Sequence, residues 1–226
     1  MVERLAPTLD RLVIVASFGQ PEYKPGLIDR LLVLAHHAAV EPLVVLNKVD
    51  LAADPAEVRS AAEEYVGLGY DVLCTSVVDQ IGVAELAQVI GHGRSALSGH
   101  SGVGKSSLLK AVDPAVTSEV LTGDLSQATG KGRHTTTRVR VWRLSSGAEV
   151  IDLPGVRLLD LAYLEPHDVY EAFPETSGAL GSCQFGDCAH GPEPGCAVKG
   201  VLESGISARR RESLDRILES VAWDGG

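Results

Sequence analysis

Aromatic residues are scarce in this chain: they make up 4% of its 226 residues, and there is a single methionine. Because 45% of the chain is nonetheless hydrophobic, the core must consist mainly of Val, Leu, Ala and Ile. Long apolar runs are missing as well, so the sequence predicts no membrane span. The apolar run 12–18 has acids around it and no small-residue cleavage site after it, which favours a first core strand over a signal peptide.

Basic residues are outnumbered, with 20 Lys and Arg against 30 Asp and Glu and a formal net charge of −10. Nucleic-acid-binding domains usually carry a basic face, so any contact with RNA must come from a local patch, a partner or another module. There are four cysteines, of which three cluster around a histidine while Cys74 lies alone in an apolar run. This pattern favours a metal site in a reducing compartment over disulfides, and we expect a cytoplasmic protein in which Cys74 is packed in the core.

Strand-like and helix-like segments alternate over the first two thirds of the chain. Apolar or alternating runs predict strands at 12–16, 43–46, 71–75, 95–98, 139–144 and 150–151, and helical spacing predicts helices at 27–38, 54–66, 83–90 and 105–112. This rhythm is typical of an α/β fold with a mostly parallel sheet and helices on both faces. The segment 117–134 is rich in Gly, Ser and Thr, and we interpret it as a mobile loop.

The character of the sequence changes after about Leu164, where short helices, Pro and Gly turns and the cysteine cluster follow. The segment 207–221 has the pattern of a charged amphipathic helix. We therefore expect two domains, an α/β domain over 1–163 and a small helical domain over 164–226.

A glycine-rich segment between a predicted strand and a predicted helix fits the pattern G-x-x-x-x-G-K-[ST] of phosphate-binding loops. Its residues are Gly99, His100, Ser101, Gly102, Val103, Gly104, Lys105 and Ser106. The glycines let backbone N–H groups surround β- and γ-phosphates at a helix N-terminus, which favours anions. Lys105 would add a positive charge, and the Ser106 hydroxyl would bind Mg²⁺. A chance Gly-Ser turn is the alternative, and the strand and helix on either side argue against it.

Another predicted strand ends in Asn47-Lys48-Val49-Asp50, which reads N-K-x-D, the guanine-specificity motif of GTPases. The Asp50 carboxylate can accept hydrogen bonds from N1–H and the 2-amino group of guanine, whereas adenine offers no such pair of donors. Asn47 and Lys48 would brace the loop and cover the base. A backbone N–H at Ser76-Val77, after the next strand, would reach guanine O6. Taken alone, N-K-x-D is also compatible with an ordinary polar turn.

The segment Asp152-Leu153-Pro154-Gly155 reads D-x-x-G directly after an apolar strand. In a GTPase this places the Asp152 carboxylate near Mg²⁺ through water and the Gly155 N–H near the γ-phosphate. Asp-x-Pro-Gly is an ordinary turn as well, and the motif gains weight from following a phosphate loop. Val156 comes next, where many GTPases carry the glutamine that orients the attacking water, so this chain cannot use that glutamine.

The segment 132–138 lies between the phosphate loop and Asp152, where a nucleotide-sensing switch is expected. Thr136 and Thr137 are the candidates here, and Thr137 would bind Mg²⁺ through its hydroxyl. His134 is the candidate to position water, since Val156 cannot do so. A histidine on the surface of a loop is an equally good interpretation of His134.

The cysteine cluster consists of Cys183, Cys188, His190 and Cys196. Three thiolates and one imidazole suit tetrahedral Zn²⁺ and leave no coordination position open, so the predicted site is structural rather than catalytic. The glycines and prolines between these residues allow the tight turns that such a site needs.

The order of the motifs is unusual, because the guanine motif precedes the phosphate loop. Together with Ser76-Val77, the segment Gly132-Arg133-His134-Thr135-Thr136-Thr137, the D-L-P-G motif and the cysteine cluster, this order closely resembles the RsgA (YjeQ) family of circularly permuted small ribosomal subunit biogenesis GTPases. The resemblance extends over nearly the whole chain. Such a permutation is physically reasonable, since the termini of compact domains often lie close together.

The resemblance implies a circularly permuted GTPase domain with a helical zinc-binding domain after it. It implies hydrolysis of GTP to GDP and phosphate, stimulated by the ribosome and coupled to late assembly of the small ribosomal subunit, with rRNA as a docking partner. It assigns guanine to Asn47, Lys48 and Asp50, the phosphates to Gly99 through Ser107, hydrolysis to His134, and one zinc ion to the cysteine cluster. We expect a monomer without a membrane partner.

Two departures from the family are visible. Ser-Val stands where Ser-Ala is usual, which is tolerable because that contact comes from the backbone. The family normally begins with an RNA-binding OB-fold, whereas this chain starts almost directly at the first GTPase strand and is acidic. The second hypothesis is therefore a nucleotide-binding or zinc interaction module with negligible turnover. A third, an ATP-dependent kinase or ATPase, is disfavoured by Asn47 to Asp50.

Overall fold

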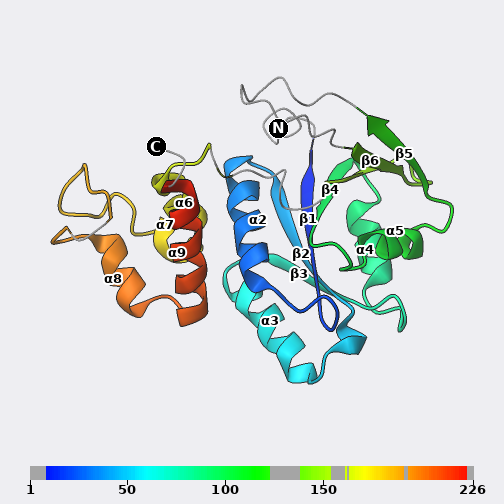
Figure 1. Ribbon diagram of the computed structural model, residues 1–226, viewed down its shortest axis with the longest axis horizontal. Coiled ribbons are helices and arrows are strands. Elements are labelled where there is room, and N and C mark those ends of the chain that lie inside the picture. Colours follow the sequence, from blue (N-terminus) through cyan, green and yellow to red (C-terminus); the bar gives the residue numbers. More distant parts are fainter. Residues whose placement is uncertain (1–8, 123–137, 154–160, 162, 191–192, 223–226) are drawn as a thin grey trace.

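The computed structural model describes residues 9–122, 138–153, 161, 163–190 and 193–222 (Figure 1). Its centre is a seven-stranded sheet with the strand order β3-β2-β1-β4-β7-β6-β5. The strands are β1 (Arg11–Ser17), β2 (Glu41–Asn47), β3 (Asp71–Thr75), β4 (Arg94–Ser98), β5 (Thr117–Thr122), β6 (Arg138–Arg143) and β7 (Glu149–Asp152). The strands β3, β2, β1, β4 and β7 are parallel to one another. At the edge beyond β7, β6 pairs antiparallel with β7, and β5 pairs antiparallel with β6. The predicted mostly parallel sheet is confirmed.

Helices cover both faces of this sheet, as predicted. They are α2 (Pro25–His37), the short 3₁₀ turn η2 (Val49–Leu51), α3 (Pro55–Gly67), α4 (Val83–Ile90) and α5 (Lys105–Val112). Side chains of β1 alternate between two cores: Leu12 and Ile14 pack with residues of α2 and α3, whereas Val13 packs with residues of α4 and α5. A strand that is buried on both faces reads as a continuous apolar run, which is why these strands were visible in the sequence.

Helix boundaries follow the local chemistry. α3 begins at Pro55, and the Asp54 side chain accepts a hydrogen bond from the Ala56 N–H at 2.8 Å, so the predicted acidic cap and first-turn proline are confirmed. α2 begins at Pro25, two residues before the predicted start, because proline is well suited to the first turn of a helix.

The prediction of a loop over 117–134 is wrong at its beginning. Thr117–Thr122 forms β5, an edge strand that pairs antiparallel with β6 from Thr117 opposite Arg143 to Thr122 opposite Arg138. Thr117, Ser118 and Glu119 are polar and exposed, and the strand pairs with β6 through backbone hydrogen bonds, so its first half leaves no apolar run in the sequence. Residues 123–134 lie outside the described residues.

The C-terminal part consists of short helices, as expected, and ends in a longer one. They are α6 (Pro166–Ala172), α7 (Pro174–Ser177), α8 (Ala197–Ser204) and α9 (Ala208–Ala222). In Figure 1, α2 lies between the sheet and the C-terminal helices. Phe173 and Leu214 are buried in the same apolar cluster as Ile28 and Leu31 of α2, so this part shares a core with the α/β part. Among the described helices, none combines the length and the apolar composition needed to cross a bilayer.

The parallel strands end together at one edge of the sheet. In register, Ser17 lies beside Asn47, Asn47 beside Thr75, and Leu97 beside Asp152. From β1 the chain runs outward through β2 and β3 and then returns to β4 on the other side of β1. Open α/β sheets bind ligands outside the carboxyl ends of the strands at such a reversal of strand order. The fold thus places a candidate site between the loops that follow β1 and β4.

Candidate functional site

The loop between β4 and α5 has the backbone that its glycines permit. Gly99, Gly102 and Gly104 have φ angles of +152°, +86° and +98°, all in the region that favours glycine. A Cβ atom at Gly99 would lie 2.2 Å from the carbonyl oxygen of Val15, so the loop can follow β1 closely only with glycine there. α5 begins at Lys105, which gives the strand, loop and helix that an anion-binding loop requires.

Asn47, at the end of β2, contacts this loop directly. Its buried side chain donates from Nδ2 to the carbonyl oxygen of Val103 at 2.8 Å and accepts at Oδ1 from the Thr75 hydroxyl at 2.9 Å. A Cβ atom at Gly104 would lie 2.5 Å from Asn47 Nδ2, so glycine is needed for this approach. Asn47 thereby connects β2, β3 and the loop after β4.

Lys48 makes a second bridge. It has a left-handed backbone with φ of +56°, and its Nζ donates to the carbonyl oxygen of Gly102 at 2.7 Å and to that of Gln20 at 2.5 Å. Gln20 belongs to the loop after β1, so Lys48 links the two loops on either side of the strand reversal. Gln20 could not be predicted from the sequence, because its contribution is a backbone carbonyl.

The other predicted guanine residues lie at the same edge. Val49 and Asp50 form the turn η2 directly after Lys48, and Asp50 is exposed. Ser76 follows the adjacent strand β3 and is buried, with Oγ accepting from the Asp79 N–H at 3.0 Å. A bridge between Ser76 and Ile81 closes the turn that contains Val77. The segments 47–50 and 76–77 therefore lie at the ends of the neighbouring strands β2 and β3.

The charges of Lys105 and Asp152 interact. Lys105 Nζ donates to the carbonyl oxygens of Gly99 at 2.9 Å and His100 at 3.2 Å, and burial lowers its pKa while Asp152 raises it. Burial raises the pKa of Asp152, and the charges of Lys105 and Arg140 oppose this. Within the described residues, Asp152 Oδ1 is buried without a hydrogen-bond donor. A buried carboxylate oxygen of this kind fits the expected contact with the water shell of Mg²⁺.

Several predicted catalytic residues lie outside the described residues: His134, Thr136, Thr137 and Gly155. Of the predicted phosphate-loop residues, Ser106 and Ser107 are in the first turn of α5 and exposed, His100, Ser101 and Gly102 are exposed, and Val103 is buried in the core under α5.

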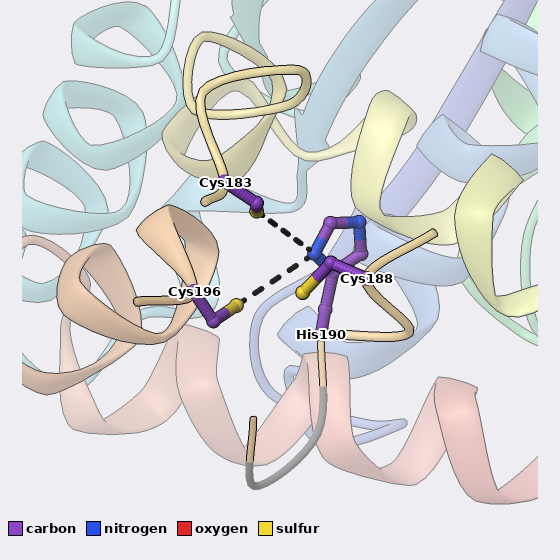
Figure 2. Close-up of side chains that lie close together, drawn as sticks. All are labelled: Cys183, Cys188, His190 and Cys196. Atoms are coloured by element: carbon purple, nitrogen blue, oxygen red, sulfur yellow. Dashed lines mark hydrogen bonds between the residues drawn. The ribbon is translucent and has the colours of Figure 1, made fainter. Parts of the chain in front are cut away.

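The four residues of the cysteine cluster come together in the C-terminal part, and Figure 2 shows their side chains pointing toward one another. Their ligand atoms all lie within 4.8 Å of each other. His190 Nδ1 is 3.5 Å from Cys183 Sγ and 3.7 Å from Cys196 Sγ. Around a tetrahedral zinc ion the nitrogen and sulfur ligands are about 3.6 Å apart, so donor set and spacing both fit zinc.

Local structure preorganises this cluster. His190 has a left-handed backbone with φ of +62°, and its ring meets the Tyr170 ring edge-on with centroids 5.2 Å apart. Cys196 caps α8, with Sγ accepting from the Lys199 N–H at 3.4 Å. Hydrogen bonds from the first N–H groups of α8, chiefly that of Ala197, lower the pKa of Cys183. Such donors favour the thiolate form that binds metal.

Comparison with known proteins decides the family. The family model described as RsgA GTPase matches residues 2–162, which is more than half of the chain. The chain belongs to the RsgA GTPase family. A relative named Small ribosomal subunit biogenesis GTPase RsgA, from Dickeya dadantii (strain 3937), is 44% identical over 221 residues, covering 96% of this chain. The chain spans 63% of the length of that RsgA relative.

Solved structures of the family agree. YjeQ from Thermotoga maritima is similar with a TM-score of 0.75 and 33% identity, covering 95% of this chain and 72% of that one. YloQ, described as a circularly permuted GTPase, is similar with a TM-score of 0.73 and 29% identity, covering 97% of this chain and 70% of that one. The fold is therefore that of a circularly permuted GTPase, as the motif order predicted.

Replacement of Gly104 by alanine should disrupt the contact between Asn47 and the loop. The new Cβ atom must displace the Asn47 amide, and overpacking of this kind costs about 1–3 kcal/mol. Gly147→Ala is the matched control, since Gly147 also has a positive φ, +88°, but open space around it. In urea denaturation, the free energy of unfolding of Gly104→Ala should be lower than that of Gly147→Ala by about 1–3 kcal/mol. Equal stabilities would contradict the close approach of Asn47.

Proposed function

We propose that this chain binds GTP and GDP at the carboxyl edge of the sheet and hydrolyses GTP to GDP and phosphate during late assembly of the small ribosomal subunit. The bond from Lys48 to the carbonyl oxygen of Gly102 carries this proposal, because it joins the guanine motif to the phosphate loop. The names and sequences of the curated relatives support the ribosomal setting.

In this proposal the guanine base lies against the ends of β2 and β3. Asp50 would accept from N1–H and the 2-amino group, and a backbone N–H of Ser76-Val77 would donate to O6. Asn47, Lys48 and Val49 would hold the loop in place, which the contacts of Asn47 and Lys48 with the phosphate loop support. An unpaired Asp50 carboxylate would disfavour ATP.

The phosphates would lie in the loop from Gly99 to Ser107, with backbone N–H groups and Lys105 neutralising their charge. Ser106, Thr137 and, through water, Asp152 would hold Mg²⁺, which when bound neutralises charge on the β- and γ-phosphates. Gly155 would donate its N–H to the γ-phosphate, and Thr136 would belong to the same nucleotide-sensing segment. His134 would position the attacking water.

The C-terminal part, 164–226, would be a zinc-binding domain attached to the GTPase domain, 1–163. One zinc ion held by the cysteine cluster would fix the loops between α7 and α8 and present them to rRNA. The chain would act in the cytoplasm as a monomer. The net charge of −10 means that a basic partner module would strengthen its contact with rRNA.

Phosphate release from GTP tests the function. We expect slow turnover that rises when small ribosomal subunits are added, more strongly for a chain fused to an RNA-binding OB-fold. Lys105→Ala should lower turnover at least about a hundredfold, since it removes the charge that faces the phosphates. Lys110→Ala, an exposed lysine of the same helix, should leave turnover unchanged. No phosphate release with or without subunits, while GDP still binds, would favour a nucleotide-binding or zinc interaction module instead.

Asp50→Asn tests the base assignment. An amide no longer accepts both guanine hydrogen bonds, which should weaken GDP binding by about 3 kcal/mol, roughly a hundredfold in Kd, and improve binding of xanthosine diphosphate. Asp54→Asn makes the same chemical change at the helix cap, where asparagine serves equally well, and should bind GDP normally. Calorimetric titration of both variants with GDP and with xanthosine diphosphate measures these affinities. Unchanged base preference in Asp50→Asn would refute the assignment.

Zinc analysis tests the metal assignment. Mass spectrometry of the native chain should find about one zinc ion per chain, and Cys196→Ser should weaken zinc binding at least about a hundredfold because a thiolate ligand is lost. Cys74→Ser should retain the metal, since Cys74 lies in β3. Zinc retained by Cys196→Ser and lost from Cys74→Ser would contradict the proposed site.

A further inference from the structure

A buried charge cluster joins the C-terminal helix α9 to helix α2. Asp29 of α2 is completely buried, and its two carboxylate oxygens each accept from a different arginine. Arg209 Nη1 donates to Oδ2 at 2.7 Å, and Arg210 Nη1 donates to Oδ1 at 2.7 Å. These bonds connect residues 180 and 181 positions apart in the sequence.

The arginines are fixed by further partners. Arg210 makes a two-pronged ion pair with Glu175, at 2.7 and 2.8 Å, and lies 4.2 Å above the Phe173 ring. Arg209 donates from Nε to Glu64 of α3 at 2.9 Å. Buried ion pairs rarely add more stability than apolar packing would, but they penalise every arrangement that leaves a charge without its partner. The cluster therefore specifies one placement of α9 on α2 and α3.

The same cluster reaches the loop between β1 and α2. The Tyr65 hydroxyl lies 3.0 Å from Asp29 Oδ1 and 3.2 Å from the carbonyl oxygen of Pro25, the first residue of α2. Tyr23, within the loop, packs against the apolar cluster that contains Tyr65, and the Arg209 guanidinium lies over the Tyr65 ring, 5.8 Å from its centroid. The charge cluster thus surrounds the point where the loop enters α2.

At its other end this loop contacts the nucleotide motifs. Tyr23 stacks on Phe18 with ring centroids 5.0 Å apart, and the Phe18 N–H donates to the carbonyl oxygen of Asn47 at 3.1 Å. Gln20 lies between Phe18 and Tyr23 in the sequence, and its carbonyl oxygen accepts a hydrogen bond from Lys48 Nζ. A continuous series of packed and hydrogen-bonded groups therefore runs from α9 to Lys48.

We propose that Asp29 and Arg209 are positioning residues that set the loop between β1 and α2, and through it Lys48, so that the placement of the C-terminal part and the affinity for guanine nucleotide depend on each other. This rests on the proposed binding of guanine nucleotides at the carboxyl edge of the sheet. Because such coupling is reciprocal, whatever shifts α9 changes nucleotide affinity, and nucleotide restrains α9.

Arg209→Met tests this with the ion pair between Arg210 and Asp29 left in place. The dissociation constant of a fluorescent GDP analogue should rise about threefold to tenfold, the range expected for modest coupling. Arg216→Met removes an arginine from the same helix that pairs with exposed Glu212, and this variant should bind like the native chain. Identical affinities of the Arg209→Met and Arg216→Met variants would overturn the proposal.

A double-mutant cycle with Lys48→Met separates positioning from general loosening of the fold. If Arg209 acts through Lys48, the effect of Arg209→Met on GDP affinity should largely disappear in the Lys48→Met background. Fully additive effects would overturn the proposal.

Should Arg209→Met fail to fold, hydrogen exchange on the native chain gives the reciprocal measurement: GDP should slow exchange in α9, and unchanged exchange there would overturn the coupling. A native chain that binds no guanine nucleotide would instead overturn the proposed function, and the coupling with it.

Discussion

Hydrogen bonds from Asn47 and Lys48 to backbone carbonyl oxygens hold the loops after β1, β2 and β4 in one arrangement. Asn47 is buried, and its amide satisfies the Val103 carbonyl while Thr75 satisfies the amide oxygen. Buried polar groups of the backbone need such partners, so the shape of the loop is fixed by the strand beside it. This contact requires glycine at 104, since any side chain there would meet Asn47.

That constraint also explains why the order of the motifs along the chain can be reversed. The site needs the carboxyl ends of β2, β3, β4 and β7 at one edge, and the sheet provides this whatever the order in which the strands are connected. The loops of the site are joined by hydrogen bonds, such as those from Lys48 to the carbonyl oxygens of Gly102 and Gln20, and these do not depend on how the chain connects the strands. Moving the chain ends therefore leaves the site unchanged, provided the core stays the same.

The sequence revealed those features that depend on a repeated pattern or on close spacing. Parallel strands are apolar on both faces and were visible, and the cysteine cluster was visible because its four residues lie within one short segment. The strand β5 was missed because an edge strand can be polar. Gln20 was missed because a backbone carbonyl has no signature, and the bond between Asp29 and Arg209 because no local pattern connects residues 180 positions apart. What sequence reasoning misses here is long-range pairing.

The small C-terminal part raises the question of what holds it in place. Its buried apolar residues, among them Phe173 and Leu214, belong to the cluster that includes α2, and so short a segment gains little stability from a core of its own. Zinc ligands would order the loops between α7 and α8, but a metal site of four neighbouring residues says nothing about where that segment lies on the GTPase fold. The shared apolar cluster attracts α6 and α9 to α2 without specifying a register, because hydrophobic contact is non-directional. The hydrogen bonds from Arg209 and Arg210 to Asp29 are directional, so they favour one placement of α9 on α2, and they do so beside the loop that contacts Lys48.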